Sequence, residues 1–170
     1  MRTSATRPEP PVRAAKARPA RARSPALAFA VQYGVARTGL PSAASLKRWA
    51  SAALERDVAA TLRFVGLAEG RTLNAVYRGK DDATNVLTFV YDDAVPLAGD
   101  IVLCAPVVAR EAAEQAITLE AHYCHLVVHG VLHLQGFDHI EEDEAEAMEA
   151  RETQIVTSLG YDDPYRLDKE

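Results

Sequence analysis

Apolar residues between positions 27 and 105 repeat at two different intervals, which predict strands and helices in alternation. Four segments carry the alternating, β-branched or aromatic pattern that is typical of strands. They are Leu27–Tyr33, Thr61–Leu67, Asn85–Tyr91 and Asp100–Cys104, with Pro96 and Gly99 in a loop between the last two.

The other apolar positions recur every three or four residues, as on one face of a helix. One predicted helix starts at the N-cap Ser42 and carries apolar positions as far as Val58, and a second covers residues 68–78. From Pro106 to Leu159 the pattern predicts three helices, with breaks near Thr118 and across Gly136–His139. Strands first and helices last predict an α+β fold, a small mixed four-stranded sheet with helices packed on one side.

The chain opens with a basic segment of different composition. Residues 1–25 hold six Arg and one Lys against one acid, Glu9, a net charge of +6. Five prolines and few large apolar residues predict a disordered Arg/Pro/Ala-rich tail without the apolar core of a secretory signal. A solvated tail, a nucleic-acid tether and an organellar transit peptide all fit this composition. Residues 26–170 are then predicted to form one domain.

The rest of the chain is acidic. It carries 12 basic and 23 acidic side chains, a net charge of −11, which argues against a protein that coats nucleic acid with its whole surface. No apolar run reaches the roughly 20 residues of a membrane helix. Two cysteines are too few for a disulfide scaffold and favour a reducing compartment. The composition therefore predicts a folded cytoplasmic protein without a membrane partner.

All five histidines lie between positions 122 and 139, and three of them have the spacing of metal ligands. On a helix, His129 and His133 lie about 40° apart around the axis and about 6 Å apart along it. Two imidazoles so placed can bind one divalent ion at roughly 2.0–2.1 Å each. Gly136 can take positive φ and end the helix, which lets His139 return to the same ion.

We therefore expect one metal ion per chain, bound by His129, His133 and His139. Three neutral nitrogen ligands leave a fourth position for water, so the pattern favours a catalytic Zn²⁺ over a structural one. Nickel or another borderline cation is the alternative metal. Histidines that only pack within a helix are the alternative without a metal.

The spacing H-x-x-x-H-x-x-G-x-x-H is that of the metzincin zinc proteases, with one chemical difference. Those proteases place a glutamate, their general base, directly after the first histidine, where this chain has Gly130. The sequence therefore has the metal ligands without the protease base. His122 and His125 are predicted to support the ligands or to pack in the core, and Cys124 points away from them. Asp138 either orients a ligand or caps the turn.

The histidine segment resembles the signature of the bacterial YbeY family of rRNA maturation factors, which are metal-dependent endoribonucleases. The resemblance is strong over residues 61–165 and looser over 27–60, and Thr88 stands where serine is common. Further similar stretches are residues 73–89 with Tyr77-Arg78-Gly79, Gly99–Val102, Leu119–His122 and Glu142–Glu149.

The resemblance implies a single-strand-specific endoribonuclease that acts in 16S rRNA 3′-end maturation and ribosome quality control. Its implied partners are single-stranded rRNA and the small ribosomal subunit with its proteins. It implies His129, His133 and His139 as metal ligands and Arg78 as the catalytic arginine. A guanidinium suits that role because phosphodiester cleavage builds negative charge on the phosphate oxygens. Either an activated water or a 2′-hydroxyl would serve as the nucleophile.

Two other functions stay open at this stage. One is a metallohydrolase of another class, peptidases included, although Gly130 argues against peptidolysis. The other is a non-enzymatic ribosome-assembly factor with a structural metal and an acidic docking surface around Glu142. Replacement of Arg78 separates the enzyme from the assembly factor, because only the enzyme needs this side chain.

Overall fold

The computed structural model describes residues 23–91 and 95–169. Most of the predicted basic tail, residues 1–22, lies outside this range. The elements in chain order are β1 Leu27–Tyr33, α1 Ala43–Ala52, β2 Val58–Val65, α2 Leu67–Arg78, β3 Val86–Tyr91, β4 Leu97–Cys104, α3 Ala105–Glu114, α4 Leu119–Leu134, α5 Glu142–Ser158 and a short 3-10 helix at Arg166–Lys169. Among the described residues, none of the helices has the length and apolarity that crossing a bilayer requires.

The strands form one mixed sheet in the order β1-β2-β4-β3. β1, β2 and β4 are parallel, and β3 pairs antiparallel with β4, so that β3 is an edge strand. The three predicted C-terminal helices are α3, α4 and α5. The predicted α+β class and the mixed four-stranded sheet are confirmed.

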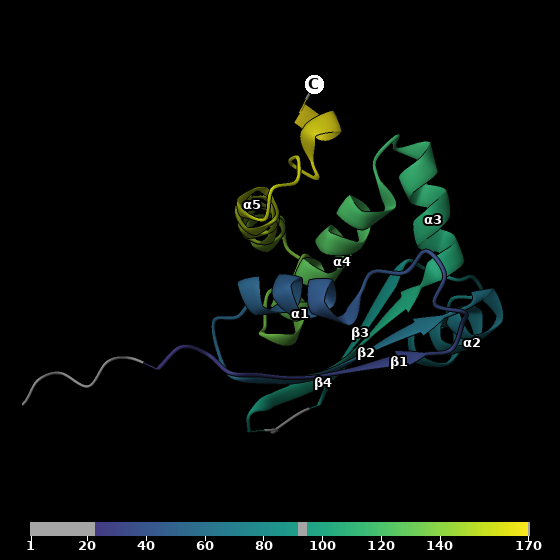
Figure 1. Cartoon of the computed structure of the whole chain (residues 1–170), viewed down its shortest axis with the longest axis horizontal. Helices are drawn as coiled ribbons and strands as arrows, with labels where there is room; N and C mark the ends of the chain where they lie inside the picture. The colour runs from purple at the N-terminus through teal and green to yellow at the C-terminus, as the bar shows by residue number, and fades with distance from the viewer. Residues whose placement is uncertain (1–22, 92–94, 170) are drawn as a thin grey trace, which may run out of the picture.

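Helices cover the two faces of the sheet unequally, as Figure 1 shows. The large core lies under α1, α4 and α5, where Leu62, Phe64 and Ile101 of the sheet contact the helices. The opposite face carries a smaller cluster around Val102 and Cys104, against which α2 packs. The sequence predicts helices on one side of the sheet, but α2 lies on the opposite face. The C-terminal end of α2 comes close to β3.

The central helix α4 is enclosed on most of its circumference. Its apolar side chains are buried, and the gap to the sheet is narrow at Gly130, where a Cβ would lie 2.9 Å from Cγ2 of Ile101. Thr118 caps the first turn, since its hydroxyl accepts from the backbone N–H of Ala121 at 3.1 Å. A fixed helix gives the side chains on its remaining face a fixed place.

Several predicted boundaries differ from the structure. The strand predicted over Thr61–Leu67 is β2, which covers Val58–Val65, and Leu67 begins α2. The helix predicted to reach Val58 ends at Ala52, and Val58 begins β2, where its N–H donates to the carbonyl of Ala26 at 3.0 Å. Pairing with β1 and β4 outweighs the helical spacing of the apolar positions there. Gly99 lies inside β4 rather than in a loop, since it pairs with Ala60 of β2 and Val90 of β3. A Cβ at this position would lie 2.3 Å from the Phe89 carbonyl oxygen.

Candidate active site

His129 and His133 lie one turn apart near the C-terminal end of α4, on the face that the sheet and the other helices leave free. Their ring centroids are 6.2 Å apart. The sequence placed them on one face of a helix, and the structure places them there. Burial lowers the pKa of His133, which favours the neutral ring that a metal ion needs.

The turn after α4 brings the third histidine back to the first two. Gly136 has φ of 99°, its N–H donates to the His133 carbonyl, and the N–H of Phe137 donates to the Leu132 carbonyl. These two bonds form a Schellman motif, which needs a residue with positive φ. His139 follows the turn, and its ring centroid lies 5.7 Å from that of His129 and 5.9 Å from that of His133.

A glutamine clamps this end of α4 to the loop before β2. Oε1 of the buried Gln135 accepts from the backbone N–H groups of Glu55 and Arg56 at 2.7 and 3.0 Å. Its Nε2 donates to the carbonyl of Ala53 at 2.7 Å. The partners are about 80 positions away in the sequence, so no local pattern predicts this clamp.

The three rings fit one divalent ion. Imidazoles bound to one tetrahedral ion at roughly 2.0–2.1 Å have centroids about 5 Å apart, and the three rings form a nearly equilateral triangle slightly wider than this. Small side-chain rotations close the difference. The donors are nitrogens, which suit zinc and other borderline cations better than magnesium or calcium.

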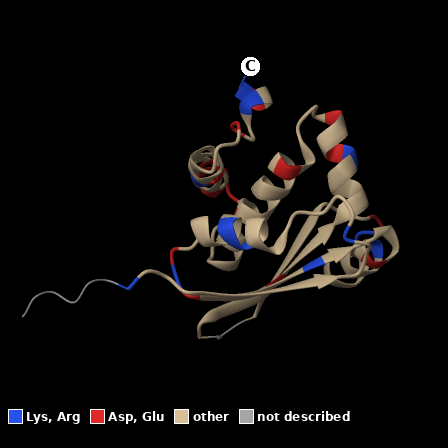
Figure 2. Ribbon diagram, in the orientation of Figure 1, with Lys and Arg blue, Asp and Glu red and all other residues tan. Residues whose placement is uncertain are grey.

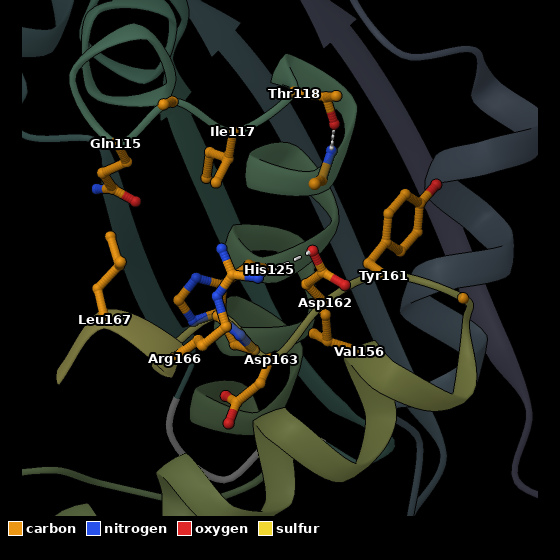
Figure 3. A pocket seen from close by; sticks show the side chains of 14 residues that line it. Gln115, Ile117, Thr118, His125, Val156, Tyr161, Asp162, Asp163, Arg166 and Leu167 are labelled. Carbon is orange, nitrogen blue, oxygen red and sulfur yellow. Dashed lines mark hydrogen bonds and ion pairs between the residues drawn. The ribbon is translucent and has the colours of Figure 1, made fainter. Parts of the chain in front are cut away.

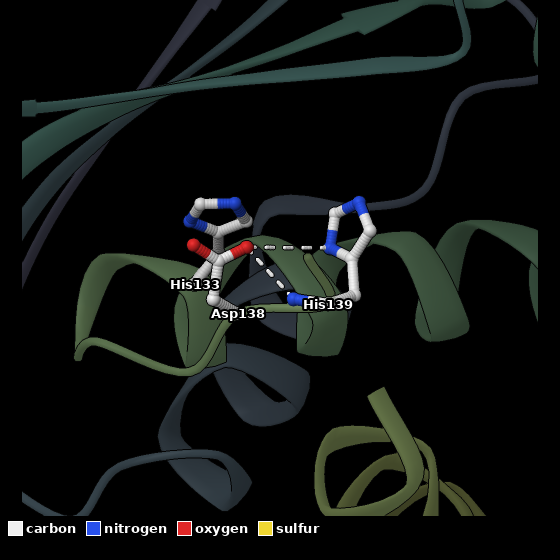
Figure 4. Close-up of side chains that lie close together, drawn as sticks. All are labelled: His133, Asp138 and His139. Atoms are coloured by element: carbon white, nitrogen blue, oxygen red, sulfur yellow. Dashed lines mark hydrogen bonds and ion pairs between the residues drawn. The ribbon is translucent and has the colours of Figure 1, made fainter. Parts of the chain in front are cut away.

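A carboxylate lies beside two of these rings. Among the described residues, the set whose ligand atoms already lie within 4.8 Å of one another is His133, Asp138 and His139, and His129 would join it after the side-chain rotations described above. Figure 4 shows Asp138 between the two rings, where its Oδ1 accepts from the backbone N–H of His139 at 2.7 Å. This bond makes Asp138 a local cap of the turn.

Glu152 of α5 contacts the His129 ring on the side that faces away from the cleft. Its side chain is 1% exposed, and Oε1 contacts Nδ1 of His129 at 2.5 Å, which leaves Nε2 of that ring free for a metal. Tyr165 donates its hydroxyl proton to Oε2, and Nε2 of His125 lies 3.2 Å from the same hydroxyl. Burial alone would raise the pKa of Glu152, but hydrogen bonds and charge from His125 and His129 lower it to about 2.

The other two histidines take supporting positions, as the sequence predicts. His125 contacts Glu152, and His122 contacts Oε2 of Glu111 through Nε2 at 2.7 Å. Asn85 donates to the same carboxylate at 3.0 Å, so this network ties α4 to α3 and to the start of β3. Cys124 is buried and lies apart from the ligand set.

Arg78 and the three histidines line one cleft, although they are about 50 positions apart in the sequence. The cleft has a volume of about 340 Å³, and β3 lies between its two sides. Arg78 is the last residue of α2, and Gly79 ends that helix with φ of 68°. Among the described residues, none pairs with the exposed Arg78 guanidinium. Figure 2 shows basic and acidic residues close together around α2 and on α3.

A buried asparagine holds the loop that connects Arg78 to β3. Nδ2 of Asn74 donates to the carbonyl of Asp82 at 2.7 Å and to its carboxylate at 3.2 Å. The loop therefore has a fixed path between the two elements that border the cleft. Asn74 stands in the stretch that resembles the family, but its partner lies in an irregular loop that no periodicity predicts.

A second cavity, of about 350 Å³, lies on the other side of α4. It is lined by the segment after α5, the loop before α4 and the ring of His125 (Figure 3). Arg166 pairs with Asp162 across four residues at its rim, at 3.7 Å.

Close packing explains why residue 130 is a glycine. It faces Ile101 of β4, where even a methyl group would crowd a buried side chain. A glutamate at this position would enter the core and not the cleft. The absence of the protease base therefore accompanies close packing of α4 on β4 at this position.

The central helix and the turn after it present three imidazoles to one cleft, which makes the cleft a candidate metal site. A family model described as Endoribonuclease YbeY matches residues 42–160. The chain belongs to the endoribonuclease YbeY family.

Curated relatives agree with the family model. Endoribonuclease YbeY of Aromatoleum aromaticum is 61% identical over 142 residues, which cover 82% of this chain and 92% of the relative. Endoribonuclease YbeY of Nitrosomonas eutropha is 56% identical over 135 residues, covering 79% and 96%. The predicted family and the predicted class of enzyme, an RNA-hydrolysing endonuclease, are thereby confirmed.

A solved structure has a similar fold. The solution structure of TM1509 from Thermotoga maritima superposes with a TM-score of 0.54 at 28% sequence identity, and covers 77% of this chain and 88% of that one. The sheet and the central helix are therefore features of a fold that an experimental structure also contains.

Proposed function

We propose that this protein is a single-strand-specific endoribonuclease that matures the 3′ end of 16S rRNA and acts in ribosome quality control. The observation that carries the proposal is the common cleft of Arg78, His129, His133 and His139. A cation site and an unpaired guanidinium on one surface match the two needs of phosphodiester cleavage, activation and charge stabilisation.

The proposed metal is one Zn²⁺ per chain, with His129, His133 and His139 as ligands. When bound, such an ion supplies Lewis-acid chemistry to a phosphodiester. Glu152 accepts the Nδ1 proton of His129 and so keeps its Nε2 lone pair directed at the ion. The Schellman turn at Gly136 holds His139 in reach of the other two rings.

Arg78 is the proposed catalytic arginine. Its guanidinium fork can donate two parallel hydrogen bonds to phosphate oxygens, where charge develops during cleavage. The side chain is exposed and pairs with no described acid, so it needs no rearrangement before it meets a phosphate. Asn74 and Gly79 fix the backbone on either side of it.

The acidic body favours an RNA that the ribosome presents. The net charge of −11 outside the first 25 residues repels a free polyanion, while Arg78 attracts it locally at the cleft. We therefore propose the small ribosomal subunit and its proteins as partners, and the cytoplasm as the place of action. Residues 26–170 are the proposed catalytic domain, and residues 1–25 a basic tail.

Cleavage of single-stranded rRNA fragments by the purified protein tests the proposal. We expect cleavage by the wild type, and its loss in His133→Ala and in excess chelator. Lys47→Ala, a substitution on the outer surface of α1, is the matched control and should cleave normally. Cleavage that persists in His133→Ala would contradict the proposal.

The two alternatives predict different results. A non-enzymatic assembly factor requires that Arg78→Ala leaves 16S 3′-end maturation intact in cells, while charge reversal at Glu142 damages it. The enzyme requires that Arg78→Ala impairs 16S 3′-end maturation, while charge reversal at Glu142 leaves it intact. Turnover of peptides that follows the bound metal would support a peptidase, which the crowded surroundings of Gly130 disfavour.

A further inference from the structure

Three aromatic side chains lie together on the α2 side of β3, and we call them the aromatic strip: Tyr77, Phe89 and Tyr91. Tyr77 is 64% exposed and Tyr91 is 49% exposed, which is high for large rings. Phe89 and Tyr91 follow one another on the same face of the strand. The strip is thus a partly exposed aromatic surface.

Tyr77 is held in place by its neighbour. Its ring meets that of Phe89 edge to face, with centroids 4.8 Å apart and an interplanar angle of 62°. Phe89 in turn packs against the smaller core cluster around Leu87 and Val102. Tyr77 therefore has a supported ring with free surface, which is the requirement for stacking a flat ligand.

The strip continues into the proposed active site. Tyr77 and Phe89 line the same cleft as the three histidines, and Tyr77 directly precedes Arg78. A nucleotide whose phosphate contacts Arg78 would have its base close to the Tyr77 ring. Arg78, whose guanidinium pairs with no described acid, adds positive charge beside the strip, which favours a polyanionic ligand over an apolar peptide.

We propose that Tyr77, supported by Phe89, stacks one unpaired nucleobase beside the scissile phosphate and so selects single-stranded RNA. The inference rests on the proposed function and assigns the base-binding part of its site. In a duplex both faces of a base are covered by its neighbours, whereas an unpaired base can leave the stack and lie on an aromatic ring. Stacking does not depend on base identity, so the subsite selects strandedness and not sequence.

A coupling experiment between protein and RNA tests this subsite. The affinity of labelled single-stranded RNA is measured by fluorescence anisotropy, for an intact oligonucleotide and for a set with one abasic nucleotide at each position. The proteins are wild type, Tyr77→Ala, Tyr77→Phe and the control Val76→Ala. Val76 is 69% exposed on the same helix and does not line the cleft. Thermal melting confirms that each variant is folded.

We expect the wild type to bind one of the abasic oligonucleotides about ten-fold more weakly than the intact RNA. Tyr77→Ala should bind intact RNA about ten-fold more weakly and lose nothing further from that abasic site. Tyr77→Phe keeps the ring and should behave as wild type, as should Val76→Ala. In cleavage assays Tyr77→Ala should raise KM with little change in kcat, since stacking is the same before and during cleavage.

Two results would overturn the inference: wild-type affinity of Tyr77→Ala for intact RNA, or equal losses from every abasic site in wild type and Tyr77→Ala. Cleavage by the wild type without this coupling contradicts the stacking subsite alone. Coupling without cleavage contradicts the proposed function and leaves the subsite as an RNA-binding site. A wild type that binds none of the oligonucleotides contradicts both.

Discussion

Glu152 shows how much of the site depends on a residue outside the histidine cluster. Its carboxylate is buried, contacts Nδ1 of His129 and accepts the Tyr165 hydroxyl proton. A buried carboxylate without partners would cost several kcal/mol, so these contacts are needed for the fold as well as for the ring orientation. The sequence gives no local sign of this role, because Glu152 is one acid among many on α5.

Replacement of Glu152 by Gln should weaken metal binding. The amide is nearly isosteric, but it has lost the negative charge that raises the basicity of His129, and we expect about 10- to 100-fold lower zinc affinity. Competition with a fluorescent chelator at neutral pH measures this. Glu146→Gln, on the exposed side of the same helix, is the control, and equal affinities of the two variants would contradict the role of Glu152.

Replacement of Arg78 tests charge stabilisation in the cleft. Arg78→Ala should lower kcat about 100-fold or more, and Arg78→Lys should recover only part of it, because an ammonium cannot form the paired hydrogen bonds of a guanidinium. Metal content should be unchanged in both. Single-turnover cleavage of an rRNA fragment gives the comparison, with the exposed Arg110→Ala as control. Full activity of Arg78→Ala would refute the assignment.

At the scale of elements, α4 is the part on which the site depends most. It is fixed at its start by Thr118, at its end by the Schellman turn and Gln135, and along its length by close packing on β4. The histidines come from the last two turns and the loop beyond, so small shifts of the helix would move two ligands together.

Gly130→Ala should destabilise the protein. Alanine gains about 1 kcal/mol in helix propensity, but its methyl group would lie 2.9 Å from a buried Ile101 side chain, and overpacking costs about 1–3 kcal/mol. We expect a net loss of roughly 1 kcal/mol in the free energy of unfolding, measured in urea.

The double variant Gly130→Ala/Ile101→Ala identifies the cause. Removal of the Ile101 side chain makes room for the new methyl group. The double variant should therefore lose less free energy of unfolding than the two single variants lose together. Additive losses, or a more stable Gly130→Ala, would show that this contact is not tight.

Elements were predictable from sequence where local pattern and tertiary structure agree. The histidine helix and its Gly136 turn follow from spacing alone, because both are local. Val58 and Gly99 were misplaced because strand pairing and a close contact with the Phe89 carbonyl decide their structure. The convergence of Arg78 with the histidines was predictable only through the family resemblance, since the pairing of β3 with β4 brings them together.

On the scale of the whole molecule, the two buried cysteines make the stability of the fold depend on pH. Both are buried without a disulfide, Cys104 near α2 and Cys124 in the middle of α4. Burial raises the pKa of Cys104, and raises that of Cys124 from 9.0 to about 12. The folded protein therefore keeps both thiols protonated under conditions where the unfolded chain ionises them.

Stability should fall as pH rises above 9. In this range the unfolded chain binds fewer protons than the folded one, so each buried thiol can lower the free energy of unfolding by up to about 1.4 kcal/mol per pH unit. Tyr123, whose pKa burial raises from 10.0 to about 12, adds to the loss above pH 10. Urea unfolding at pH 8 and pH 10 measures the fall, which should be smaller in Cys124→Ala. A profile that is flat, or identical in the variant, would contradict this.

The central claim is that one metal ion binds where His129, His133 and His139 converge. An anomalous difference map from crystals of the purified protein, recorded on both sides of the zinc absorption edge, tests it most directly. We predict one peak per chain within bonding distance of all three rings. A peak on His133, Asp138 and His139 that leaves His129 free, or no peak in a zinc-loaded crystal, would contradict it.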